Sequence, residues 1–101
     1  MSKATVPLAP YGATLTLTDS RETFQKLSGA SCEGCDGMAA SVCGGYVIGW
    51  FDGELNTLVH ECTHVSLFLM EHVGMDVHAA GGEPMAYLMG WMVEEALQRL
   101  R

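Results

Sequence analysis

The feature that most constrains the fold is the longest apolar periodic stretch of the chain, residues 53–73. Near its middle stands the sequence His60-Glu61-Cys62-Thr63-His64, which has the pattern H-E-x-x-H. Asp52 before the stretch is a favourable helix N-cap, and Gly74 after it is a favourable helix stop. The spacing of the apolar residues therefore predicts one long helix over about 53–73.

The two histidines of this helix form a candidate metal site. Residues four apart lie on one face of an α-helix, so the imidazoles of His60 and His64 can bind the same ion. Imidazole nitrogens are common zinc ligands, and a glutamate beside the first histidine can reach a water on that metal. The pattern predicts His60 and His64 as ligands of Zn²⁺ and Glu61 as a base. A pair of histidines that binds no metal is the alternative interpretation.

The packing face of the same helix is expected on the side opposite the histidines. Histidines that filled a core would lie on the apolar stripe, so separate faces favour a functional role for the pair. The expected core stripe consists of Leu55, Val59, Cys62, Ser66, Leu69 and Val73.

The remaining regular structure is expected to be two strands and a second helix. Residues 13–18 alternate apolar and polar side chains, and residues 45–51 are rich in aromatic and β-branched residues, so both predict strands. Pro84 marks the first turn of a helix over about 83–100. Together these elements predict an α+β fold, with a sheet of two to four strands packed on two main helices.

The other segments carry weaker signals. Residues 1–12 contain two prolines and a glycine and are expected to be irregular, and residues 28–45 are expected to form a glycine-rich loop. Residues 19–27 fit either a helical turn or a strand. A chain of 101 residues is long enough for one core only, so residues 1–101 are expected to be a single domain.

The charge balance excludes some classes of partner. Twelve acidic residues against five basic ones give a formal net charge of −7. Proteins that bind nucleic acid or anionic membranes present basic surfaces, so neither partner is expected. The N-terminal residues lack a signal-peptide pattern and no apolar run has membrane-spanning length, which predicts a cytoplasmic protein. Exposed apolar residues around a shallow site would be compatible with a homodimer.

Three cysteines fall in the glycine-rich loop. Cys32 and Cys35 form a C-x-x-C knuckle, which is a common half of a structural zinc site, and Cys43 could supply a third thiolate. No fourth ligand stands at the usual spacing. Reduced thiols in a loop are therefore favoured over a second, structural zinc.

A catalytic zinc usually has three protein ligands, and three candidates for the third follow the metal helix. Asp76 and His78 come soon after the helix end, where the chain has been carried away from His64. Glu83 follows a loop that gives the chain room to return. We therefore favour Glu83 over His78 and Asp76. A carboxylate that stabilises the start of a helix through the dipole is the non-metal interpretation of Glu83.

Two segments also resemble a known family. Residues 57–64 (TLVHECTH) and 81–88 (GGEPMAYL) are similar to segments of small phage- and prophage-encoded zinc metallopeptidases of the gluzincin type. In such proteins a glutamate at the head of an E-x-x-A-Y-like segment completes a helical H-E-x-x-H. The resemblance covers roughly residues 46–98 and implies a minimal zincin-like fold with His60, His64 and Glu83 as ligands and Glu61 as base. The metzincin extension H-x-x-G-x-x-H is absent.

The favoured hypothesis is a zinc metallopeptidase that hydrolyses a peptide bond through a zinc-bound water, with Glu61 as general base. The oxyanion of the intermediate needs a hydrogen-bond donor, for which Tyr87 is the first candidate and His78 and Tyr46 are the next. A packed aromatic ring with a satisfied hydroxyl is the structural interpretation of Tyr87. The partner would be a protein or peptide substrate, which the edge of the strand at 46–51 could bind in extended form.

A second hypothesis is an interaction module without catalysis. In it, zinc stabilises a small acidic phage or prophage protein that binds or inhibits a host protein. A closed site with four protein ligands would indicate this structural role, whereas an open position on the metal would indicate chemistry.

Overall fold

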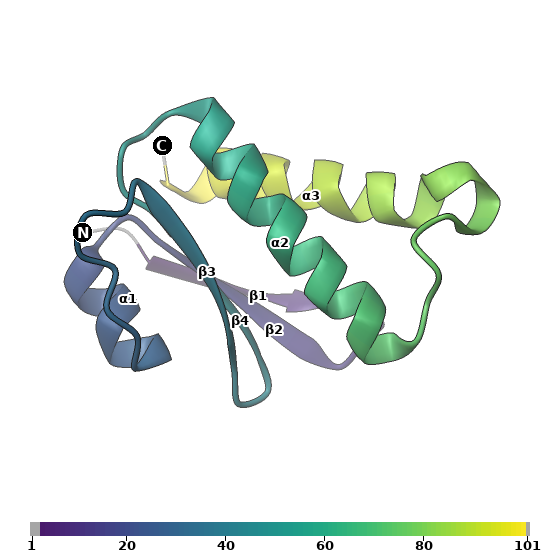
Figure 1. The fold of residues 1–101 in the computed structure, drawn as a ribbon, viewed down its shortest axis with the longest axis horizontal. Coiled ribbons are helices and arrows are strands. Elements are labelled where there is room, and N and C mark those ends of the chain that lie inside the picture. The colour runs from purple at the N-terminus through teal and green to yellow at the C-terminus, as the bar shows by residue number, and fades with distance from the viewer. Residues whose placement is uncertain (1–2, 101) are drawn as a thin grey trace.

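A four-stranded mixed sheet with helices on both faces forms the structure, a computed structural model that describes residues 3–100 (Figure 1). The α+β prediction is confirmed. The ends of the expected domain, residues 1–2 and 101, lie outside the described residues. The elements are β1 (Lys3–Leu8), β2 (Ala13–Thr18), α1 (Arg21–Ser28), β3 (Gly37–Val42), β4 (Gly45–Trp50), α2 (Leu55–Val73), the 3₁₀ helix η1 (Ala79–Gly82) and α3 (Glu83–Leu100).

The order of the strands in the sheet is β1-β2-β4-β3. The β1–β2 and β3–β4 pairs are antiparallel, whereas β2 and β4 are parallel. The long strand predicted at 45–51 is therefore a central strand, flanked on both sides. Its edge is not free to bind a peptide, so that part of the sequence prediction is wrong. The strand next to β4 on its outer side is β3, and β3 forms that edge of the sheet.

Two strands form where the sequence predicted irregular chain. In β1, Pro7 pairs with Thr14 at the edge of the sheet, where a residue without an N–H is tolerated. The buried side chains of β1, Val6 and Leu8, alternate with exposed ones, but the proline masks that pattern. In β3, the small residues Ala39 and Ala40 weaken the strand signal, and pairing with β4 forms the strand.

The two faces of the sheet bury separate hydrophobic clusters. The larger cluster lies under α2 and α3 and includes Leu15, Leu17 and Ile48. The smaller cluster lies on the opposite face, where α1 contributes Phe24 against Val47. The sheet thus separates α1 from the two long helices, of which α2 carries the candidate site.

The segment 19–27, undecided from the sequence, forms the helix α1. Ser20 is its N-cap, and the Ser20 hydroxyl accepts a hydrogen bond from the backbone N–H of Thr23 at 3.2 Å. Gly29 ends the helix with a left-handed φ of 72°, which is costly for residues with a Cβ. These two caps explain why a polar segment of only eight residues is helical.

The start of α2 differs slightly from the prediction. The helix begins at Leu55, and Asp52 lies two residues before its N-cap, Glu54. The Asp52 carboxylate accepts hydrogen bonds from the Glu54 backbone N–H at 2.9 Å and the Thr57 hydroxyl at 2.7 Å, so it still stabilises the helix start. The predicted stop at Gly74 is confirmed, with φ of 72°.

The buried side of α2 is rotated from the predicted stripe. Cys62, Ser66 and Leu69 are buried as expected, but Leu55, Val59 and Val73 are 51%, 38% and 37% exposed. The prediction was wrong at these three positions because α2 is covered by two neighbours, the sheet and α3. The arc that they bury includes Leu58, Glu61, Val65 and Met70.

The second predicted helix is confirmed as α3 with the expected bounds. Leu88, Met92 and Ala96 are its buried residues. Two weak hydrogen bonds to sulfur mark the contact with α2, from Thr63 to Met89 and from Ser66 to Met92. No helix within residues 3–100 is long and apolar enough to cross a membrane.

Candidate metal centre

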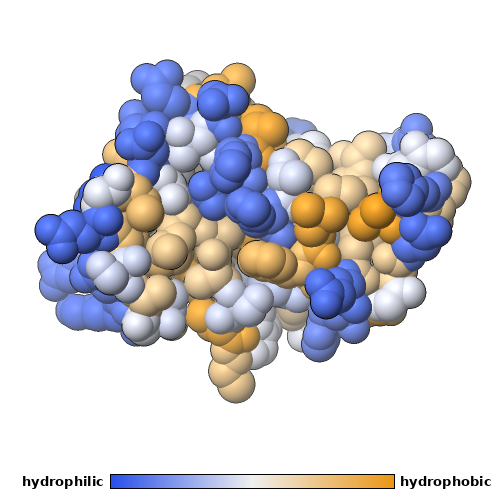
Figure 2. Space-filling model, in the orientation of Figure 1, coloured by the Kyte–Doolittle hydropathy of each residue, from blue (hydrophilic) through white to orange (hydrophobic). Residues whose placement is uncertain are grey.

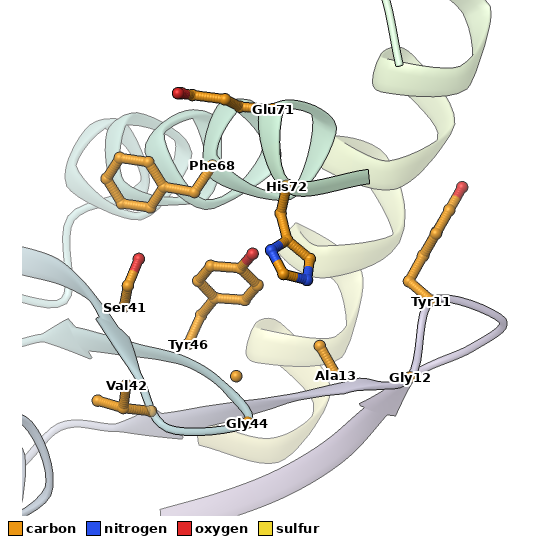
Figure 3. A pocket seen from close by; sticks show the side chains of 11 residues that line it. Tyr11, Gly12, Ala13, Ser41, Val42, Gly44, Tyr46, Phe68, Glu71 and His72 are labelled. Atoms are coloured by element: carbon orange, nitrogen blue, oxygen red, sulfur yellow. The ribbon is translucent and has the colours of Figure 1, made fainter. Parts of the chain in front are cut away.

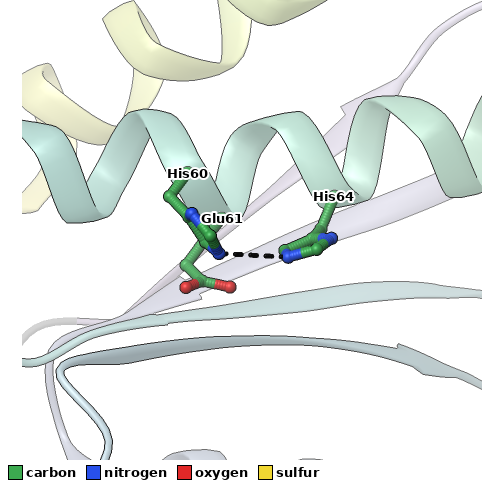
Figure 4. Close-up of side chains that lie close together, drawn as sticks. All are labelled: His60, Glu61 and His64. Carbon is green, nitrogen blue, oxygen red and sulfur yellow. Dashed lines mark hydrogen bonds between the residues drawn. The ribbon is translucent and has the colours of Figure 1, made fainter.

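The imidazoles of His60 and His64 project side by side from the exposed surface of α2 (Figure 4). Their Nε2 atoms lie 3.2 Å apart, and their ring centroids are 4.8 Å apart. The regular helix causes this arrangement, because residues separated by four positions stand one turn apart on the same face. Both Nε2 atoms point into the same space, which is the arrangement that two ligands of one ion need.

This separation fits zinc. Two nitrogens each about 2.0–2.1 Å from a tetrahedral ion would be about 3.3 Å apart. The observed 3.2 Å between the Nε2 atoms is close to that distance. Within residues 3–100, the group of side chains that could hold a metal is His60, Glu61 and His64, whose ligand atoms lie within 4.8 Å of one another.

Glu61 lies beneath the histidines, where α2 faces the strands (Figure 4). Only 7% of the residue is exposed. Burial raises the pKa of its carboxyl group above the ordinary value, and the neighbouring His60 and His64 act in the opposite direction. The site therefore combines two exposed imidazoles with a poorly hydrated carboxylate that lies beneath them.

The edge strand β3 forms the wall beside this carboxylate. A Cβ on Gly37 would lie 2.6 Å from Thr57 Cγ2 and 3.2 Å from Glu61 Cγ, so the glycine allows strand and helix to approach closely. The backbone of β3 thus runs directly beside the candidate metal group. The small residues of β3 give no strand signal in the sequence, so neither this strand nor its outer edge, the only sheet edge in residues 3–100 that lies against α2, was predicted.

An aromatic stack extends from the metal group along α2. The His64 and Phe68 rings are stacked at 6.1 Å between centroids, and the Phe68 and Tyr46 rings are stacked at 6.3 Å. The sequence contains a signal for the first pair, because Phe68 follows His64 by four residues. Tyr46 joins the stack only through the fold. Of the three candidate oxyanion donors, Tyr46 is the one linked to the histidines by ring contacts.

The structure does not bring Glu83 or Tyr87 to this group. Both lie exposed on α3, where they share a surface hollow with Trp91 and Glu94. The contact side of α3 faces Thr63 and Ser66 of α2, away from the histidines. The assignment of Glu83 as third ligand thus remains a prediction from the sequence.

The other two candidate ligands lie in the turn that follows α2. The Asp76 carboxylate accepts a hydrogen bond from the backbone N–H of His78 at 2.9 Å, and both side chains are exposed. Neither belongs to the group formed by His60, Glu61 and His64. The two histidines are therefore the predicted ligands that the structure brings together.

The cysteines occupy different environments and are all free thiols. Cys32 is buried, and its thiol donates a weak hydrogen bond to the Arg21 carbonyl at 3.6 Å. Cys35 is half-buried, whereas Cys43 is exposed at the β3–β4 turn. Within residues 3–100 these thiols are not part of a potential metal group.

Comparisons with protein-family models, with curated proteins and with solved structures find no match to this chain. Side-chain geometry and chemistry therefore carry the functional argument.

Proposed function

We propose that this protein is a zinc-dependent peptidase in which His60 and His64 hold the metal and Glu61 is the general base. The observation that carries the proposal is the 3.2 Å separation of the two Nε2 atoms above a buried carboxylate. Residues four apart on a helix are neighbours, and these two rings are also turned so that their Nε2 atoms meet at hydrogen-bond distance, which is the separation that one shared zinc ion requires. Zinc, when bound, would supply a Lewis acid that activates water and polarises a carbonyl.

Glu61 has the position and the environment for proton transfer. Its carboxylate lies within 4.8 Å of the ring nitrogens, a distance that leaves room for a water between them. Burial raises its pKa above the ordinary value, against the opposing effect of His60 and His64, and a raised pKa suits a group that first accepts a proton and then delivers it to the leaving amine. Burial also keeps the carboxylate away from bulk water.

The outer edge of β3 is the proposed binding surface for an extended peptide. An edge strand presents unpaired backbone N–H and C=O groups, to which another strand can add. Gly37 at the start of β3 packs against Glu61, so a peptide on this edge would pass the base. Backbone pairing would hold the peptide while the metal group faces one of its amide bonds.

The test is the substitution Glu61→Gln, which keeps the size of the side chain and removes its basicity. We expect the variant to bind one zinc per chain and to lose at least about 100-fold in hydrolysis of quenched fluorescent casein and of a blocked peptide library. Glu22→Gln, on α1 across the sheet, is the matched control and should retain wild-type turnover. Turnover that persists in Glu61→Gln would contradict the proposed mechanism.

The same variant separates two roles for Glu61. If its carboxylate were a metal ligand, Glu61→Gln would lose zinc as well as activity. Retained zinc with lost turnover supports the role of base.

An interaction module is the second candidate, and the exposed aromatic side chains of α3 favour it. Tyr87 is 76% exposed and Trp91 is 38% exposed. Tyrosine and tryptophan are the residue types that often dominate binding interfaces. Apolar side chains also remain exposed along α2, on the face shown in Figure 2.

The state of the metal discriminates the two functions. We would replace zinc with cobalt and titrate acetohydroxamate, a small bidentate metal ligand. A change in the visible spectrum indicates an open coordination position and supports the peptidase. An unchanged spectrum indicates a closed site and supports the module.

A further inference from the structure

A pocket of about 450 Å³ lies beside the metal group, near the C-terminal end of α2 (Figure 3). Phe68 and His72 of α2 form one side of it, and Ser41 of β3 and Tyr46 of β4 form the other. The start of β2 closes it at Ala13. The cavity is thus built by three strands and the same helix that carries the histidines.

The pocket shares a wall with the metal group. Phe68 stacks on His64 with 21° between the ring planes, and on Tyr46 with 25°. Tyr46 and Phe68 are lining residues of the pocket, whereas His64 belongs to the metal group. One ring, Phe68, therefore separates the two sites.

Strand β3 connects the two sites along the other side. Gly37 at its start lies against Glu61, and Ser41 near its end lines the pocket. Four strand residues span about 13 Å, which is a few residues of an extended peptide. A peptide paired with the outer edge of β3 would pass Glu61 and then reach the mouth of the pocket.

The lining of the pocket favours an aromatic side chain. The rings of Phe68 and Tyr46 line the pocket and offer aromatic contact, and the hydroxyls of Ser41 and Tyr46 can hydrogen-bond a polar ring edge. Burial raises the pKa of Tyr46 above the ordinary value, which keeps its phenol neutral. Among residues 3–100, no lysine or arginine lines the cavity, and the Glu71 carboxylate at its margin disfavours an acidic side chain, for which His72 is the one basic neighbour.

We propose that this pocket receives an aromatic side chain of the peptide substrate, within a few residues of the cleaved bond. The proposal rests on the peptidase function, because it assumes a peptide on β3. It adds the substrate class, which is peptides with phenylalanine, tyrosine or tryptophan near the cleavage point.

The experiment measures binding instead of turnover. Zinc-loaded Glu61→Gln protein is titrated with blocked seven-residue alanine peptides that carry Tyr, Leu, Lys, Glu or Ala at the centre. Isothermal titration or anisotropy of a labelled peptide gives Kd. We expect the Tyr peptide to bind at least about tenfold more tightly than the Ala peptide, with Leu between them and no gain for Lys or Glu.

Pocket variants in the same background assign the preference to the cavity. Phe68→Leu removes the shared ring, and Ala13→Leu fills part of the space; each should reduce the Tyr-over-Ala ratio at least about threefold. Phe51→Leu, at a half-buried ring on the opposite face of the sheet, is the matched control and should keep the ratio. If circular dichroism shows that Phe68→Leu is not folded, the Tyr-over-Ala ratio of Ala13→Leu alone tests the assignment.

The failure of this proposal is distinct from the failure of the peptidase function. Equal Kd values for all five peptides, a Lys preference, or a Tyr preference unchanged in the pocket variants would each overturn the pocket assignment. Wild-type hydrolysis could persist in all three cases. Conversely, a Tyr preference without hydrolysis by the wild type would keep the pocket and overturn the peptidase.

Discussion

Gly37 of β3 lies directly against Glu61 of α2: a Cβ on the glycine would stand 3.2 Å from Glu61 Cγ and 3.0 Å from the Gly49 carbonyl oxygen. The candidate base is therefore positioned by the edge strand as well as by its own helix. A side chain at position 37 would also meet Thr57 Cγ2 at 2.6 Å, so the Thr57 side chain, the strand or the carboxylate must move to make room.

The substitution Gly37→Ala tests this contact. We expect the free energy of unfolding to fall by about 1–3 kcal/mol, because the added methyl group overpacks the interface. Hydrolysis should fall at least about tenfold, because a base displaced by even 1 Å loses its alignment. Zinc affinity, measured by competition with a chromogenic chelator, should stay within about threefold because His60 and His64 are untouched.

Gly90→Ala is the matched control for that substitution. A Cβ at Gly90 meets no atom within 4 Å, and the residue lies in the exposed part of α3. Alanine is the better helix former, so the control should gain about 0.5–1 kcal/mol of stability and keep wild-type activity. Full activity in Gly37→Ala would refute the positioning role of the strand.

Zinc binding should depend on the histidine pair. We expect His60→Ala and His64→Ala each to lower zinc affinity at least about 100-fold, because each removes one of two converging nitrogens. Zinc should also raise the melting temperature of the wild type but of neither variant, since a ligand that binds only the folded state stabilises it. Elemental analysis and thermal melts with and without zinc measure both effects.

The substitution Glu83→Gln tests whether Glu83 is the third zinc ligand, as the sequence predicts. Because Glu83 is not part of the group around His60 and His64, we expect zinc affinity to stay within about threefold of the wild type. A loss as large as that of His60→Ala would instead show that Glu83 joins the coordination sphere, as the resemblance implies. The same competition assay distinguishes these outcomes.

The parts of the fold that depend on local sequence were predictable. Both long helices have apolar periodicity over many turns and clear end signals, such as Gly74 and Pro84, so their bounds were predicted to within two residues. The histidine pair was predictable for the same reason, because a four-residue spacing fixes relative position on a helix. These features need no knowledge of the rest of the chain.

The parts that depend on tertiary contacts were not predictable. The strand β3 consists largely of small residues and forms through pairing with β4. In β1, Pro7 interrupts the alternating pattern that would otherwise predict a strand. The buried arc of α2 depends on where α3 packs, so Val59 lies outside it although its spacing fits. The pocket joins residues from position 11 to position 72, and no local pattern indicates that they meet.

Cysteine reactivity provides an independent test of burial beside the metal group. Burial raises the pKa of the Cys62 thiol to about 12, with the nearby charge of Glu61 as a smaller cause. We expect iodoacetamide at neutral pH to modify the exposed Cys43 at least about 100-fold faster than Cys62, because the thiolate is the reactive form. Peptide mapping by mass spectrometry over time measures the two rates. Comparable rates would contradict the packing of this side of α2.

The start of α2 should make stability depend on acid pH. Hydrogen bonds from the Thr57 hydroxyl and then from the Glu54 backbone N–H lower the pKa of Asp52 below its ordinary value. A carboxyl group with a lowered folded pKa contributes stability above its unfolded pKa and loses that contribution as pH falls through the folded pKa. Wild type should therefore be more stable than Asp52→Asn near neutrality, and the difference should shrink as the pH is lowered below about 4. Urea unfolding of both proteins from pH 7 to pH 2.5 measures it, with Glu33→Gln, at an exposed loop position, as the control. A difference that is constant across this range would show that the charge on Asp52 does not stabilise the helix that presents His60 and His64.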